Sequence, residues 1–462
     1  MTPAARLAAV IEVLDAVAAE RAPADQVLKH WGRAHRFAGS GDRRAIAERA
    51  YDILRARARL AWAMGGSDGR ALVLGALAHL DGLEPPQIEA LFTGGHAPEP
   101  LTDAERVRLI TPPEAPPADV LAGVPGFVAD ALRAQFGDDW FDEAQALVQP
   151  RAPVDMRVNA LCGRVDGALK LLAHEGIEAQ RTPLSAWGLR LPPQFAADVQ
   201  KTRAYTTGWI EVQDEGSQLM AFLAGAEPGQ TVIDYCAGGG GKTLALAAQM
   251  HTPTAHPRGS GDPGRAAALP VKDLGPRFRG DERNRLIALD VNQRRLDAIP
   301  ERLTRAGASA ELQLIGPDGE GTEEFEALAD LVLVDAPCTG SGTWRRRPEG
   351  AWRVSPDDVA RLGALQPKIL ARAARLVKPG GRLAYVTCSI FAAENDAVAA
   401  SFAADHPDFR PVPIARAAAT PALTDAARTR LAALAGDGHT LQLTPRRTNT
   451  DGFFIALFER PL

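Results

Sequence analysis

The chain has 462 residues, more than a single ordinary hydrophobic core accommodates, so we expect two or three domains. Hydrophobic residues make up 46% and charged residues 24% of the sequence, which excludes a largely disordered chain. The 52 basic and 57 acidic residues give a formal charge of −5, so binding of a nucleic acid would require a local basic face.

The N-terminal stretch MTPAARLAAVIEVLDAVAAE carries acidic residues among its apolar ones, which predicts an amphipathic helix rather than a signal peptide. No apolar run in the sequence is long enough to cross a bilayer. The cysteines are far apart and form no CxxC pair, which favours a reducing cytosol over a disulfide scaffold or a zinc site. They are Cys162, Cys236, Cys338 and Cys388. We therefore expect a cytoplasmic protein with no bound metal, and the sequence indicates no obligate protein partner.

Residues 1–110 predict an all-helical domain, because apolar residues recur at helical spacing and strand-like runs are scarce. The proline-rich stretch TPPEAPPA (111–118) predicts a linker. A helical stretch over 127–149 follows, and Pro150 closes it.

Residues 118–216 are expected to combine these linker helices with a small α+β module over 151–212. Its predicted strands lie in MRVNAL, GLRLP and WIEVQ, with a helix in GALKLLAHEG. The module is rich in basic residues, which suits either a solvated surface or an RNA-guiding face. These residues are Arg151, Arg157, Arg164, Lys170, Arg181, Arg190, Lys201 and Arg203.

Residues 217–462 alternate apolar runs with helical segments, which predicts an α/β domain with a mostly parallel sheet buried on both faces. One segment, 251–283, is rich in Gly, Pro, Arg and Asp without periodicity and is predicted to be a disordered insertion. Ligands bind at the carboxyl ends of parallel strands, whereas this connection enters the opposite edge. Deletion of 253–282 is therefore expected to leave the activity of the domain largely intact.

The stretch VIDYCAGGGGKT (232–243) is the first candidate ligand site. A strand that ends in Asp234 is followed by a glycine run and a helix that starts at Lys242, so the backbone can approach a nucleotide-like ligand closely. The stretch nearly fits a phosphate-binding loop, but Cys236 occupies the place of the opening glycine. The second candidate is Asp290, which ends the strand LIALD, where α/β folds bind a ribose hydroxyl; an N-cap role is the structural alternative.

Two further motifs, LVLVDAPCTGSGTWRRRPEGAW (331–352) and GRLAYVTCSIF (381–391), bring cysteines to strand ends. The first delivers Asp335 and Cys338, followed by Trp344 and three arginines, which suit base stacking and phosphate contact unless the tryptophan is structural. The second delivers Cys388 to the same edge of the sheet. A single cysteine there would more often be a packing residue, but two on neighbouring strand ends favour chemistry.

Together, CAGGGGKT, DAPC, TCS with a following ENDAV helix, and the terminal TDGFF resemble the RsmB/Sun (NOP2/Sun) family of RNA cytosine-C5 methyltransferases over essentially the whole chain. The resemblance implies a NusB-like RNA-binding N-terminal domain and a class I, Rossmann-like methyltransferase domain with a mostly parallel seven-stranded sheet. It also implies an RNA substrate, 16S rRNA in RsmB-like proteins, and S-adenosylmethionine as cofactor. Gly238 and Gly239 depart from the family's usual Ala-Pro, which we expect to loosen the loop.

In this family, Cys388 would attack C6 of cytosine, because C5 alone is too poor a nucleophile, and Cys338 would assist product release. Asp335 and Lys242 would hold the base. The cofactor would lie along Cys236, Ala237, Gly238, Gly239, Gly240, Gly241 and Lys242, with Asp290 on the ribose and Asp335, Arg295 and Asp318 nearby. Two alternatives stay open: a P-loop-like NTPase, and a non-catalytic NusB-like RNA-binding factor. A class I enzyme that methylates an amino group is disfavoured, because the motif it requires is absent where DAPC stands.

Overall fold

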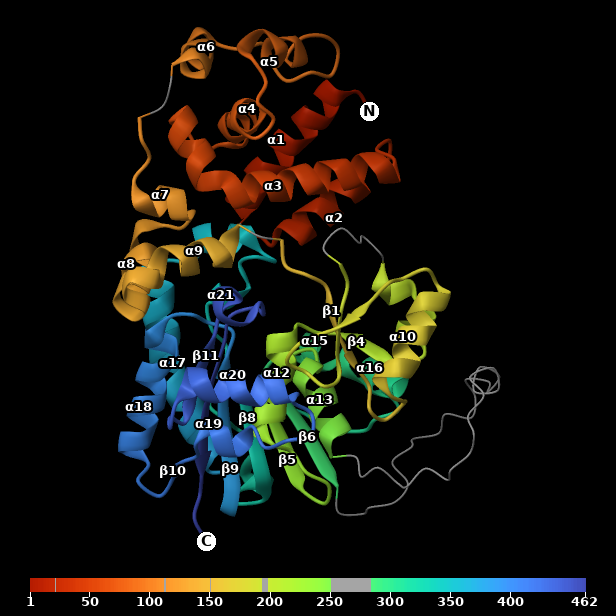
Figure 1. Ribbon diagram of the computed structural model, residues 1–462, viewed down its shortest axis with the longest axis vertical. Helices are drawn as coiled ribbons and strands as arrows, with labels where there is room; N and C mark the ends of the chain where they lie inside the picture. The colour runs from red at the N-terminus through yellow and green to blue at the C-terminus, as the bar shows by residue number, and fades with distance from the viewer. Residues whose placement is uncertain (21, 112–113, 150, 193–197, 251–283) are drawn as a thin grey trace. The chain divides into compact units, whose positions relative to one another are not determined.

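Figure 1 shows a computed structural model of the protein. It describes residues 1–20, 22–111, 114–149, 151–192, 198–250 and 284–462, and the predicted insertion 251–283 lies outside them. The chain divides into two compact units. The first consists of Met1–Arg151 with Gly340–Asp358, and the second of Ala152–Thr339 with Val359–Leu462.

The first unit is helical throughout its described secondary structure. Its longest helix, α3 (Ser40–Met64), packs an apolar stripe against α1 (Pro3–Glu20) and α4 (Gly69–His79) in one hydrophobic core, as the helical spacing predicts. The left-handed Gly65, with φ +68°, ends α3. The remaining helices are α2 (Ala24–Ala34), α5 (Pro85–Leu91), α6 (Asp103–Ile110), α7 (Ala118–Ala122), α8 (Gly126–Phe136) and α9 (Trp140–Val148), and the short helices are η1 (Gly137–Asp139), η5 (Ser341–Thr343) and η6 (Pro348–Trp352).

The helical stretch expected over 127–149 consists of two helices, α8 and α9, because Gly137 turns the chain with φ +55°.

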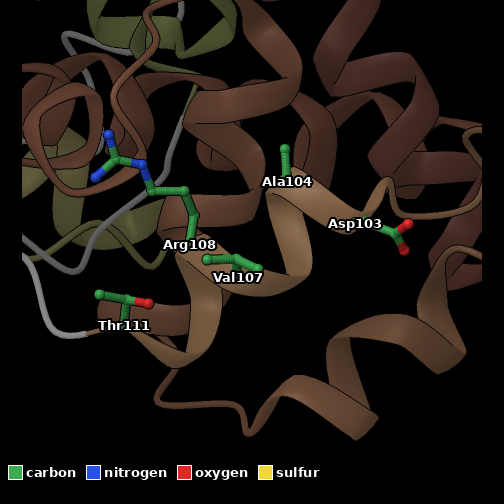
Figure 2. A pocket seen from close by; sticks show the side chains of 5 residues that line it. All are labelled: Asp103, Ala104, Val107, Arg108 and Thr111. Carbon is green, nitrogen blue, oxygen red and sulfur yellow. The ribbon is translucent and has the colours of Figure 1, made fainter.

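A hollow beside α6 is lined by Asp103, Ala104, Val107, Arg108 and Thr111 (Figure 2). It contains no residue that the sequence singles out for function.

The second unit contains a small antiparallel sheet in the order β2-β3-β1-β4. Its predicted strands and helix are confirmed, and the helix α10 (Val165–His174) shares an apolar core with the sheet. The strands are β1 (Asp155–Val158), β2 (Gln180–Arg181), β3 (Gly188–Arg190) and β4 (Ile210–Val212). The two-residue, exposed β2 has no sequence pattern that would reveal it.

The larger sheet of this unit has the order β10-β12-β9-β8-β5-β6-β7, with β11 paired to β12. Five adjacent strands of this order are parallel, namely β9, β8, β5, β6 and β7. The pairings of β12 are antiparallel. The strands are β5 (Thr231–Tyr235), β6 (Arg285–Asp290), β7 (Glu311–Leu314), β8 (Ala329–Asp335), β9 (Val377–Thr387), β10 (Arg410–Pro411), β11 (Thr440–Leu443) and β12 (Phe453–Glu459). The mostly parallel sheet is confirmed, but the expected count of seven strands is wrong, because the described residues form eight.

Successive residues of the central strands enter opposite cores, which explains their unbroken apolar sequences. In β8, Leu331 and Leu333 join one core, while Val332 and Val334 join the other. The first core is covered by α12 (Glu215–Ala224), α13 (Gly241–Gln249), α16 (Ile299–Ala306), α19 (Ile414–Ala417) and α20 (Asp425–Ala435), and the second by α17 (Pro356–Ala374) and α18 (Asp396–Asp405). Two short helices, α15 (Gln293–Leu296) and α21 (Pro445–Thr448), and the 3-10 turns η2 (Val199–Lys201), η4 (Glu323–Phe325) and η7 (Ala392–Glu394) complete the unit with α11 (Arg203–Thr206).

In the part of the chain that the structure describes, every helix is too short or too polar to traverse a bilayer.

Candidate active site

The candidate site forms where the parallel strands end. Because β5, β6, β8 and β9 run in the same direction, the residues after them meet at one edge of the sheet. These strands bring Cys236, Asp290, Asp335 and Cys388 to that edge.

The glycine turn between β5 and α13 depends on left-handed backbone. Gly238 and Gly240 adopt φ of +58° and +80°, and Cys236 itself adopts +71°, which is costly for a residue with a side chain. A Cβ on Gly240 would lie 3.1 Å from Cγ1 of Ile299, so this glycine is also needed for close packing. The following Gly241 starts α13 with nothing within 4 Å of the position of its Cβ, which leaves the backbone open to a ligand.

Asp290 holds this turn in place from the end of β6. Its carboxylate accepts the backbone N–H of Gly238 at 2.8 Å and that of Asn292 at 2.7 Å. The backbone N–H of Ala237 donates to the carbonyl of Leu289 at 2.8 Å, so β6 and the turn are joined at two points. Asp290 is buried and shapes the glycine turn, while its remaining lone pairs can still accept a ligand hydroxyl.

Cys236 lies among negative charges. Burial raises the pKa of its thiol, and the carboxylates of Asp290, Asp335 and Asp234 raise it further, while Arg295 opposes them. This cysteine is therefore a neutral thiol and a poor nucleophile. The same carboxylates make the turn a favourable surrounding for a cationic ligand.

Lys242, on the first turn of α13, reaches Asp335 at the end of β8, and its Nζ donates to Oδ2 at 2.7 Å. Burial disfavours the ammonium charge, but attraction to Asp335 and this hydrogen bond outweigh burial, so the pKa of Lys242 is raised. The thiolate form of Cys388 would raise the pKa of Lys242 further. The ion pair therefore places a permanent cation close to the second cysteine motif.

The sulfur atoms of Cys338 and Cys388 lie 3.4 Å apart, and both side chains are partly exposed. The neighbouring strands β8 and β9 bring them together, with Asp335 in register with Val386. The N–H of Ala336 extends this pairing beyond the strand by donating to the carbonyl of Val386 at 2.9 Å. Two accessible thiols therefore face one another next to the Lys242–Asp335 pair.

Two buried acids were not assigned a role from the sequence. Asp234 lies beneath the turn, accepts the Thr243 hydroxyl at 2.6 Å, and has a pKa raised to about 7, mainly by burial and secondly by the charge of Asp335. Glu394 lies behind the cysteines and accepts hydrogen bonds from Thr339 and Ser389. Its place in ENDAV was the only signal that could have drawn attention to it.

Two of the expected cofactor residues lie apart from the cluster in their side-chain contacts. Asp318 follows β7 and forms an exposed ion pair with Arg372 of α17. Arg295 is an exposed residue of α15 whose charge acts on Cys236. The structure therefore gathers the glycine turn, Asp290, Lys242, Asp335 and the two cysteines more closely than it gathers these two.

Of the two alternatives for Trp344, the structure favours the structural one, because this side chain is 0% exposed. Arg345 is also buried, at 2%. In the α+β module, Arg157 is 1% exposed and Arg190 pairs with the buried Asp155, so neither contributes to a basic face. The other predicted basic residues of this module, Arg151, Arg164, Lys170, Arg181, Lys201 and Arg203, are exposed.

No group of three or more His, Cys, Asp or Glu side chains among the described residues is arranged to hold a metal ion.

A parallel sheet with a glycine turn after one strand and acids and cysteines after its neighbours defines a Rossmann-like fold of the methyltransferase type. The sequence model of the family described as "16S rRNA methyltransferase RsmB/F" matches residues 280–459. That of the "Methyltr_RsmF/B-like, ferredoxin-like domain" matches residues 124–198. The chain belongs to the RsmB/Sun family.

Curated relatives agree with this assignment. The chain is 33% identical over 308 residues to "Ribosomal RNA small subunit methyltransferase B" of Sodalis glossinidius, across 66% of this chain and 59% of the relative. It is 32% identical to "Probable ribosomal RNA small subunit methyltransferase B" of Bacillus subtilis, across 65% of this chain and 58% of the relative. The chain thus spans less than two thirds of the length of these two relatives.

Solved structures show the same fold. The structure of PH0851 superposes with a TM-score of 0.72 over 99% of both chains, at 24% identity. A methyltransferase homolog from Pyrococcus horikoshii gives a TM-score of 0.55 and 27% identity over 75% of this chain and 98% of its own. NSun6 from the same organism, solved with SFG, gives 0.54 and 16% over 73% of this chain and 98% of its own.

Proposed function

We propose that the protein is an S-adenosylmethionine-dependent methyltransferase that methylates C5 of a cytosine in RNA, with 16S rRNA as its substrate. The observation that carries this proposal is the 3.4 Å separation of the Cys338 and Cys388 sulfurs. Methyl transfer to oxygen or to an exocyclic nitrogen requires no thiol, whereas an aromatic carbon needs activation by a nucleophile.

The residues at the strand ends fit the proposed cofactor. The backbone at Gly238 and Gly241 is open to a nucleoside, and we assign the ribose hydroxyl to Asp290, whose carboxylate accepts the Gly238 N–H beside this turn. The carboxylates around Cys236 favour the positive charge of a sulfonium. When bound, S-adenosylmethionine would supply an electrophilic methyl group on that sulfonium. Arg295 and Asp318 would lie near it.

We assign the first covalent step to Cys388. After the thiol has lost its proton to solvent, its sulfur forms a bond to C6 of cytosine, and the electron pair of the C5–C6 double bond becomes available at C5. Lys242 provides a cation beside the thiolate. Asp335 would accept an N–H of the cytosine amino group and, once N3 of the adduct has taken a proton from solvent, the N3–H as well. The target base must leave the stack to reach this edge of the sheet.

Carbon C5 then takes the methyl group, and the C5–H bond must break before the C6–sulfur bond can. We assign the acceptance of this proton to the Cys338 thiolate, whose sulfur lies 3.4 Å from the sulfur that would hold the base. Loss of the proton restores the C5–C6 double bond and expels the Cys388 thiolate. The two cysteines therefore have different tasks, addition for Cys388 and release for Cys338.

We further propose that residues 1–110 are the NusB-like, RNA-binding part of the chain and residues 118–216 a guiding module, ahead of the methyltransferase domain over 217–462. In the helical part, Phe37 is 72% exposed and contacts the ring of His35 edge-on, next to the exposed Arg36. An exposed aromatic ring beside a cation suits base stacking and phosphate contact.

The test combines tritium-methyl transfer with trapping of the protein–RNA adduct. Cys388→Ala is expected to lose both transfer and adduct, whereas Cys338→Ala is expected to lose turnover but to accumulate the adduct on denaturing gels. Adduct formation by Cys388→Ala would overturn the assignment. Bisulfite sequencing of RNA from cells with and without the gene would identify the cytosine, and parallel titrations with ATP and S-adenosylmethionine would separate this proposal from an NTPase.

A further inference from the structure

Glu394 lies directly behind the cysteine pair, and its carboxylate is completely buried. Oxygen Oε1 accepts the backbone N–H of Thr339 at 2.9 Å and Nε2 of Gln366 at 3.1 Å. Oxygen Oε2 accepts the hydroxyls of Thr339, at 2.6 Å, and of Ser389. The carboxylate is thus satisfied by four donors from three separate segments of the second unit.

Two of the residues that donate to Glu394 directly follow the two cysteines in the sequence. Thr339 immediately follows Cys338, and Ser389 immediately follows Cys388. One carboxylate therefore holds the residue after each cysteine, and the two hydroxyls lie 3.4 Å apart, as the two sulfurs do. β8 and β9 fix the strands, but both cysteines lie beyond the last residues of these strands, where the ladder no longer holds the backbone.

Further hydrogen bonds fix Glu394 itself. The hydroxyl of Tyr385 donates to the Glu394 carbonyl at 2.6 Å. Asn395 donates to the Ser389 carbonyl at 2.9 Å and accepts the Thr387 hydroxyl at 2.6 Å. The turn that carries Cys388 is thus held both through side chains and through its backbone.

A buried carboxylate is an expensive way to stabilise a fold, because desolvation of the charge consumes most of what its hydrogen bonds contribute. Its advantage lies in direction, since charge-assisted hydrogen bonds are short and hold their donors in one geometry. An apolar side chain would fill the same space but would remove the acceptor that the Thr339 N–H and hydroxyl share with the Ser389 hydroxyl, and both turns would be free to separate.

We propose that Glu394 is a positioning residue that sets the distance between the Cys338 and Cys388 sulfurs. The catalytic meaning of this distance rests on the proposed function, but the distance itself does not. Loss of Glu394 is expected to separate the turns and to slow the step in which Cys338 acts on the adduct held by Cys388.

The direct test uses phenylarsine oxide, which condenses with two adjacent thiols to form two As–S bonds and one water, without oxidation. The full-length wild type is expected to bind one arsenical across the pair, and Cys388→Ser is expected to lose this site. Glu394→Ala is expected to bind at least tenfold more weakly while remaining folded. Glu459→Gln is the matched control, because it removes a carboxylate from an exposed ion pair with Arg416 in the same unit and should bind as the wild type does.

Folded Glu394→Ala with wild-type arsenical affinity would overturn the proposal. If this variant does not fold, Glu394→Gln and Thr339→Val decide, since each removes part of the network and should weaken arsenical binding severalfold. In methyl-transfer assays, Glu394→Gln should lower kcat more than it raises KM and should accumulate the covalent adduct. A wild type that binds the arsenical but transfers no methyl group would refute the proposed function and leave the role of Glu394 in place.

Discussion

Lys242 and Asp335 form a partly buried ion pair, 2.7 Å from Nζ to Oδ2, that joins the first turn of α13 to the end of β8. It connects the proposed cofactor turn to the cysteine motifs. The ammonium is almost completely buried, whereas the carboxylate side chain is 33% exposed and faces the candidate site. The two groups can therefore act on a bound base as a single dipolar unit.

Lys242→Met is expected to reduce kcat/KM for methyl transfer by about 100-fold, because the cation beside Cys388 is lost. Asp335→Asn should cost a similar factor, and the double variant should be little worse than either, since both act through the same pair. Lys378→Met is the control, because Lys378 pairs with Asp330 at the other end of β8 and β9. Wild-type kcat/KM in Lys242→Met would contradict the assignment.

Asp234 makes stability depend on pH. Its pKa in the folded protein is raised to about 7 from 3.8, so folding favours its protonated form. The folded state then binds more protons than the unfolded state between these values, and this group lowers the free energy of unfolding as pH rises from about 4 to about 7. Above pH 7 the full penalty applies, equivalent to at most about 4 kcal/mol.

Asp234→Asn removes the ionisation but retains an oxygen that can accept the Thr243 hydroxyl. We expect the variant to gain stability relative to the wild type between pH 5 and pH 8, measured by urea unfolding monitored through fluorescence. A difference between the two proteins that is the same at both pH values would show that Asp234 does not titrate in this range.

The sequence was most informative about the central strands, whose apolar runs allow only one arrangement of the backbone. The apolar runs at β5, β6, β8 and β9 predicted parallel strands, and parallel strands necessarily bring Cys338 and Cys388 to one edge. The short strands β10 and β11 were missed. In β10, the exposed Arg410–Pro411 pair has no strand pattern and is defined only by its partner β12.

Side-chain environment was less predictable than position. Trp344 and its neighbouring arginines suited either a nucleic-acid surface or a structural role, and Trp344 and Arg345 are buried. Their segment, Gly340–Asp358, belongs to the helical unit. In that unit Glu349 accepts the backbone N–H of Ala24 at 3.0 Å, and Arg57 lies over the Trp352 ring at 4.6 Å. Local composition contains no information about contacts with residues some 300 positions away.

The glycine turn gives a matched pair of substitutions. Gly240→Ala should destabilise the protein by about 1–3 kcal/mol, because Gly240 has φ +80° and its Cβ would press on Ile299. Gly241→Ala, in the first turn of α13 with free space at Cβ, should change stability by less than about 1 kcal/mol. Thermal unfolding of both variants checks this, and equal losses would contradict the backbone argument.

Arg157 and Arg164 allow a buried cation to be compared with an exposed one in RNA binding. Its guanidinium lies inside the α+β module, where Nε donates to Gln213 at 2.7 Å and burial lowers its pKa to about 10. Arg157→Met should therefore leave the salt dependence of RNA affinity unchanged, while it costs about 1–3 kcal/mol of stability because Gln213 loses its donor. Arg164→Met, on the exposed surface of the same module, should reduce the slope of log affinity against log salt by about 0.7 if that side chain contacts a phosphate of single-stranded RNA.

Fluorescence anisotropy with an rRNA fragment at several salt concentrations measures the slopes of both variants. A lower slope in Arg157→Met with the fold intact would mean that this guanidinium reaches RNA, and that the module opens on binding.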